Sequence, residues 1–159
     1  MKKPFDKTIK QAAGLGLIAG LRATIAPSIA AHYLSKQPSS SLAKSKLGFI
    51  QSPVTAIVTK ALSAAEMSGD KLPNVPDRTI APSLLARIAS GALAGAIVST
   101  ANKDNVVKGI VIGGIAALAS TYASFYLRKS ISASSYLKEP WTGVVEDVLA
   151  IGSGVLIMR

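Results

Sequence analysis

The sequence contains no cysteine, which excludes disulfide bonds, thiolate catalysis and cysteine-based metal sites. Its single histidine, His32, cannot build a zinc site by itself. Aromatic residues make up 5% of the chain and charged residues only 16%, against about 25% charged residues in soluble domains. We therefore expect no metal and no cofactor, and the shortage of charge argues against a soluble domain.

Acidic residues are the scarcer charged class, with 8 Asp and Glu against 18 Lys and Arg, so the net charge is +10. A strongly basic chain suggests nucleic-acid binding when its cations share one face with stacking aromatic residues. Here most cations fall in short gaps between apolar blocks, which is the distribution expected of membrane loops. The lipid bilayer, rather than nucleic acid, is the partner that this charge distribution predicts.

Apolar residues form 49% of the chain and are gathered into long blocks. Blocks of about this length predict membrane helices. The second block is short and is interrupted by Lys60 and Glu66, so it crosses only in part or lies among the other helices. The sequence thus predicts an all-α fold, a polytopic membrane bundle of about five hydrophobic helices, some short or broken, in a single domain over residues 1–159. The five blocks are 12–34, 53–68, 82–100, 106–127 and 142–158, with an exposed loop at 35–49 and a linker at 128–140.

Small-residue seams recur in these blocks and predict close helix packing, because glycine lets two backbones approach. The glycines concerned are Gly16, Gly20, Gly91, Gly95, Gly109, Gly113, Gly152 and Gly154.

One short motif occurs twice: residues 24–28 and 79–83 both read Thr-Ile-Ala-Pro-Ser, each just after an arginine. In the first copy, Pro27 lies inside an apolar block, where it removes a backbone donor and must bend or break the helix. Thr24 and Ser28 can satisfy the backbone groups that such a break frees. Arg22 is costly in an apolar block unless it meets a carboxylate, a carbonyl or a wet cavity.

Charged side chains inside the blocks mark a candidate site. Arginine and carboxylate groups inside a bundle cost less as hydrogen-bonded pairs, so we expect Arg22 and Arg87 to pair with carboxylates, in either combination. The candidates for lining a pathway or binding an ion are Arg22, Thr24, Pro27, Ser28, Glu66, Asp70, Arg87, Glu146 and Asp147.

Two functions from different classes are compatible with these charges. An arginine-bearing block precedes a carboxylate-bearing one twice, an imperfect internal repeat of the kind found in small transporters. The first hypothesis is therefore a transporter or channel for a small ion or solute. The alternative is a non-transporting membrane scaffold or homo-oligomer whose charge pairs are architectural. We expect no enzyme, because no nucleophile elbow or phosphate-binding loop accompanies the carboxylates.

Short motifs in a consistent order also resemble a known family. They are Gly20-Leu-Arg22, Glu66 followed by Asp70-Lys-Leu-Pro73, Arg87 with Gly91-Ala-Leu, and Glu146-Asp-Val-Leu-Ala150. Together they resemble small bacterial multi-span membrane proteins grouped as domain of unknown function 4126, from Gly14 to the end of the chain. The first Thr-Ile-Ala-Pro stretch departs from that pattern. The resemblance implies a multi-pass protein of the bacterial inner membrane and implies no activity.

Membrane orientation follows from the loop cations if all five blocks cross. Nine loop and tail cations then share the side of the N-terminus and five lie on the other side. Because the more positive side faces the cytoplasm, we predict a cytoplasmic N-terminus.

Overall fold

The computed structural model describes residues 4–69, 80–133 and 139–158. Over these residues the fold is all-α, with seven α-helices and one 3-10 helix. They are α1 (Pro4–Leu21), α2 (Ile25–Lys36), α3 (Ser40–Ala43), η1 (Gly48–Gln51), α4 (Pro53–Gly69), α5 (Ala81–Ala101), α6 (Val106–Ala133) and α7 (Glu139–Met158). The predicted all-α class is confirmed, whereas a bundle of five membrane spans is not.

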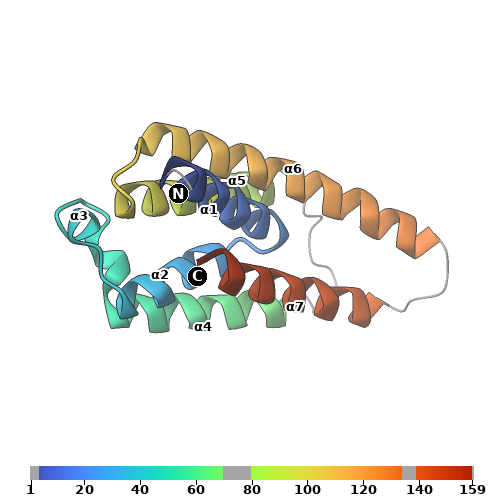
Figure 1. The fold of residues 1–159 in the computed structure, drawn as a ribbon. Coiled ribbons are helices and arrows are strands. Elements are labelled where there is room, and N and C mark those ends of the chain that lie inside the picture. Colours follow the sequence, from blue (N-terminus) through green and yellow to red (C-terminus); the bar gives the residue numbers. More distant parts are fainter. Residues whose placement is uncertain (1–3, 70–79, 134–138, 159) are drawn as a thin grey trace.

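The long helices form two layers (Figure 1): α1, α5 and α6 lie in one, and α2, α4 and α7 in the other. Leu15 and Ile18 of α1 are buried together with Ala26 of α2 and Ile97 of α5, so the core lies between the layers. Proline begins two helices as expected, because its missing N–H costs nothing in a first turn: α4 starts at Pro53, and Pro82 lies in the first turn of α5.

Glycine allows the helices of the first layer to pack backbone against backbone. A Cβ atom on Gly91 of α5 would lie 2.5 Å from the carbonyl oxygen of Gly113 in α6, and one on Gly16 of α1 would also collide with Gly113. The predicted seams in α1, α5 and α6 are therefore confirmed. Gly152 of α7 differs, since a Cβ there would meet no atom within 4 Å.

The first apolar block does not cross the bundle, which corrects the expectation of one span over residues 12–34. Thr8 and Gln11, near the start of α1, both accept hydrogen bonds from the Asn102 amide at the end of α5. Just after α2 ends, Ser39 donates to the carbonyl of Ala101, at the same end of α5. The chain therefore enters and leaves at one end of the bundle, and α1 and α2 form a helical hairpin (Figure 1).

The segment after this hairpin is more ordered than the exposed loop expected at 35–49. It holds α3 and η1, and Leu42 and Ile50 are fully buried or nearly so. These two apolar side chains anchor the segment to the bundle. The high serine and lysine content of the segment by itself predicts an exposed loop instead. The expected linker at 128–140 is also partly wrong, because α6 continues to Ala133.

Two described helices are long and apolar enough to cross a membrane: Ala81–Ala101 and the Val106–Leu127 part of α6. About 44% and 33% of their most apolar windows are buried inside the protein. Two such helices are weak evidence of a membrane protein, because core helices of soluble proteins meet the same criteria of length and composition.

Candidate functional site

The site is built around the break between α1 and α2. The Arg22 amide still donates to the carbonyl of Ile18, as in a helix, but residues 23 and 24 form a turn and α2 begins at Ile25. Pro27 thus lies in the first turn of α2, where its ring is tolerated. The expected break occurs, and it lies just before the proline. A break leaves carbonyls at the end of α1 and N–H groups at the start of α2 without helical partners.

The Glu66 carboxylate binds the N–H groups at the start of α2. Its Oε1 accepts from the amide of Ala23 at 3.1 Å, and its Oε2 accepts from the amide of Thr24 at 2.9 Å and from the Thr24 hydroxyl at 2.5 Å. A helix N-terminus carries partial positive charge, which an adjacent carboxylate stabilises. Glu66, near the end of α4, therefore acts as a cap for a helix in a different part of the chain.

The Arg87 guanidinium binds the opposite end of the break. Its Nη1 donates to the carbonyls of Gly20 and Leu21 at 2.9 and 2.6 Å. Two hydroxyls from other helices assist, since Thr121 also donates to Gly20 and Ser90 donates to the carbonyl of Ala23. The Arg87 guanidinium thus lies against the negative end of the α1 dipole. The whole Arg87 side chain is almost fully buried there.

A buried ion pair completes the cluster. Arg22 Nε donates to Asp147 Oδ1 of α7 at 2.8 Å, with side-chain exposures of 2% for Arg22 and 10% for Asp147. The expectation that Arg22 meets a carboxylate is therefore confirmed, with Asp147 as its carboxylate partner among the described residues. We call Arg22, Glu66, Arg87 and Asp147 the charge cluster; it balances two positive against two negative side chains.

The remaining predicted residues behave differently. Thr24 does take part in the break, but its hydroxyl donates to Glu66 and not to a freed carbonyl. Ser28 is buried on α2 and lines a separate cavity. Asp70 and the side chain of Glu146 lie outside what the structure describes, so a carboxylate partner for Arg87 stays a prediction.

Sequence reasoning missed Ser90 and Thr121. Both are small hydroxyl residues in otherwise apolar, glycine-rich helices, and nothing in the local pattern distinguishes them from ordinary helix positions. Only the crossing of α5 and α6 over the end of α1 brings their hydroxyls to the freed carbonyls.

Two cavities adjoin the hairpin. One, of about 320 Å³, lies at the end where α1 begins and is lined by polar side chains that include Lys7, Gln11 and Asn102. The other, of about 290 Å³, lies between α2, α4 and α7 and is mainly apolar. Among the described residues, no group of three His, Asp or Glu side chains is placed to hold a metal ion.

Comparison with known proteins gives a family and nothing more specific. No curated protein and no solved structure matches the chain. A family model described as "Domain of unknown function (DUF4126)" matches residues 9–159, which is nearly the whole chain and includes the charge cluster. The protein therefore belongs to the DUF4126 family.

Proposed function

We propose that the protein is a multi-pass protein of the bacterial inner membrane that moves a small ion or solute, with the α1–α2 hairpin and the charge cluster as its gate. The observation that carries the proposal is the broken helix, whose freed ends are bound by Glu66 and Arg87 among apolar helices. Broken helices occur at membrane depth where they lie within protein or line a cavity, and they form the substrate sites of many transporters.

Exposed apolar surface supports the membrane location. Large side chains on three helices point away from the protein, including Ile57 of α4, Ile115 of α6 and Leu156 of α7, which are 68%, 62% and 71% exposed. Exposed apolar side chains that form a contiguous patch mark a membrane or protein contact. In this proposal α4, α5, α6 and α7 cross the bilayer, while α1 and α2 enter it from one side and return.

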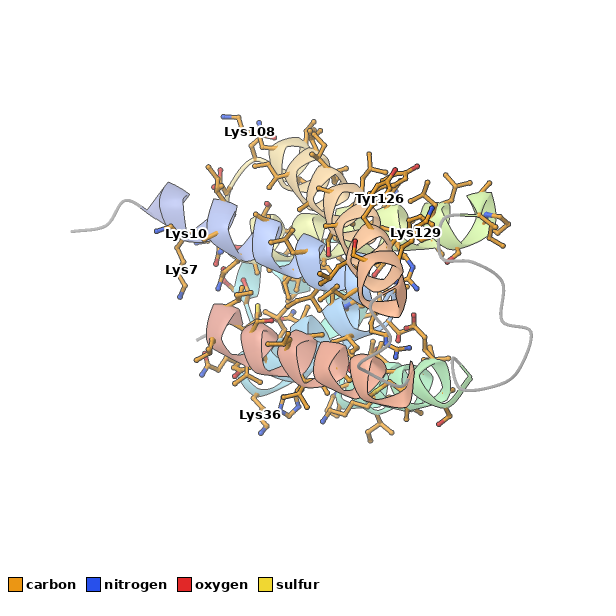
Figure 2. The ribbon with its side chains drawn as sticks, turned by 90° about the vertical axis from the view of Figure 1, so that its right-hand side faces the viewer. Lys7, Lys10, Lys36, Lys108, Tyr126 and Lys129 are labelled. Atoms are coloured by element: carbon orange, nitrogen blue, oxygen red, sulfur yellow. The ribbon has the colours of Figure 1, made fainter. Side chains whose placement is uncertain are left out.

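The distribution of lysine supports an orientation. Lys7 lines the polar cavity beside Asn102 at the entry end of the hairpin, and Lys36 ends α2 at the same end. Lys129 lies near the C-terminal end of α6, which is the end nearest the viewer in Figure 2. Lys7 and Lys36 extend from the periphery of the bundle in the same view. By the positive-inside rule, the entry end with the N-terminus faces the cytoplasm.

The ion pair at the break suggests how the gate works. Asp147 is held by Arg22, so a proton or cation reaching Asp147 competes with the guanidinium. Neutralising the carboxylate removes one of the attractions that tie the hairpin to α7, while Gln11 and Tyr33 still donate hydrogen bonds to α7 carbonyls. The gate then opens by separation of Arg22 from α7, while Glu66 and Arg87 keep the two helix ends bound.

The experiment that tests the proposal is flux through purified protein in sealed liposomes. Pyranine-loaded vesicles report proton movement after an acid pulse, and imposed gradients of Na⁺, K⁺ and Cl⁻ report the other ions. We expect flux in the parent and in a Lys129→Ala control. In Asp147→Asn, at matched protein content, we expect flux that no longer responds to pH, because the neutral amide cannot be protonated and no longer holds Arg22. Absence of flux in the parent for all of these ions would contradict an ion pathway.

The membrane scaffold remains the second candidate function. One observation favours it: Arg22, Glu66, Arg87 and Asp147 each have a hydrogen-bond partner within the protein. A scaffold predicts no flux in the parent, together with an Asp147→Asn variant that loses stability or assembly.

A further inference from the structure

The cavity between α2, α4 and α7 has the chemistry of an amphiphile site. Its volume is about 290 Å³, and its walls include Ile25, Ile29, Met67 and Ile151. That volume is at the lower end of the range for small-molecule sites, which suits one flexible chain. We call this cavity the α2–α4–α7 groove.

One end of the groove is cationic. Lys60, the charged residue among those lining the groove, is exposed, and its Nζ lies 3.0 Å from His32 Nδ1. At this distance the ammonium donates to a neutral imidazole, which fixes the lysine at the groove. Lys36 is also exposed and follows His32 by one helical turn on α2.

The groove has a direction. Along α2, residues run from Ile25 at the helix break to His32 near the basic end, and along α4 they run from Lys60 to Met67 beside Glu66. The cations thus lie toward the end that we assign to the cytoplasm, and the apolar walls extend toward the charge cluster. This is the arrangement of a phospholipid in the cytoplasmic leaflet, with its headgroup outside and its chain inside.

We propose that the α2–α4–α7 groove binds one acyl chain of an anionic phospholipid, with the headgroup phosphate on Lys60 and Lys36. Charge complementarity selects the anionic lipid, since juxtamembrane lysines attract anionic headgroups. The site ends beside Thr24 and Glu66, so an occupied groove packs against the helix break. This inference rests on the proposed membrane location and does not depend on transport.

Native mass spectrometry of the full chain in a nonionic detergent tests the headgroup. The probes are phosphatidylglycerol and phosphatidylcholine with identical acyl chains. We expect one bound phosphatidylglycerol, held in preference to phosphatidylcholine, and a preference about fivefold weaker in Lys60→Gln, the effect of one lysine near an anionic headgroup. Lys129→Gln, at the far end of α6, keeps the parental preference. Equal binding of both lipids by the parent would overturn the proposal.

A second pair of variants tests the groove itself. Ala61 and Ala64 are both exposed alanines on α4, but only Ala64 lines the groove. Ala64→Phe should remove the bound lipid and Ala61→Phe should retain it. Lipid retained by Ala64→Phe, or a fatty acid that displaces phosphatidylglycerol at one per protein, would refute the assignment. Because binding is measured without a gradient, a protein that binds lipid but shows no flux refutes transport alone.

Discussion

Removal of Arg22 should be among the most damaging single changes in this protein. Arg22→Ala leaves the Asp147 carboxylate buried without the guanidinium that now lies 2.8 Å from it. It also removes one of the side chains that tie the hairpin to α7, and leaves the hydrogen bonds that Gln11 and Tyr33 donate to α7 carbonyls. We expect the folded protein to remain helical but to unfold at a clearly lower denaturant concentration or temperature than the parent.

The size of the effect follows from burial. Arg22 and Asp147 have side-chain exposures of 2% and 10%, so water does little to replace the lost partner. Breaking a buried ion pair on one side costs about 3–5 kcal/mol. Asp147→Asn in the Arg22→Ala background removes the stranded charge, and the coupling between two contacting residues recovers about 0.5–3 kcal/mol of the loss.

The assay is reversible unfolding in mixed detergent micelles, followed by circular dichroism, for the parent, both single variants and the double variant. Lys129→Ala, an exposed cation on α6, serves as the control and should change stability by about 0.5 kcal/mol or less. An Arg22→Ala protein as stable as the parent, or effects of the two variants that simply add, would refute the buried-pair reasoning.

Three further predictions follow from the break, the packing and the hairpin. Glu66→Ala removes the acceptor of three hydrogen bonds at the start of α2, so the same unfolding assay should show a loss of about 2–4 kcal/mol, smaller in Glu66→Gln because the amide keeps one acceptor oxygen. Gly95→Ala places a Cβ against the α6 backbone and should lower the free energy of unfolding by about 1–3 kcal/mol. Gly152→Ala, with open space around it, should leave the free energy of unfolding unchanged or raise it, and equal effects of the two variants would contradict the packing. Reporter fusions after Ser40 and after Asn102 should both read cytoplasmic, because the hairpin returns to its entry side, and a periplasmic signal at either position would contradict this topology.

The resemblance to the DUF4126 family could be recognised from the sequence because several motifs, each of them short, lie in a consistent order along the chain. Helix starts were also predictable at Pro53 and Pro82, since proline in a first turn is a local property of the backbone. The small-residue seams were equally accessible, because the spacing of glycines four apart shows which helices can approach closely.

The reversal of the chain after Arg22 could not be predicted from the local sequence pattern. An apolar block of this length and composition fits one bent span as well as a hairpin. The hairpin depends on partners far along the chain, since Glu66 binds the start of α2 and Arg87 binds the end of α1. Local pattern carries no information about contacts more than 40 residues apart.

The sequence by itself determined the helical class, the small-residue seams and the types of charged group that meet inside the bundle, because these depend on composition and on spacing within one helix. Only the tertiary structure decided that Asp147 holds Arg22, that Glu66 acts as a helix cap, and that Ser90 and Thr121 satisfy freed carbonyls. The physical reason is that a broken helix must find hydrogen-bond partners for its ends, and which side chains supply them depends on how α4, α5, α6 and α7 pack around the break.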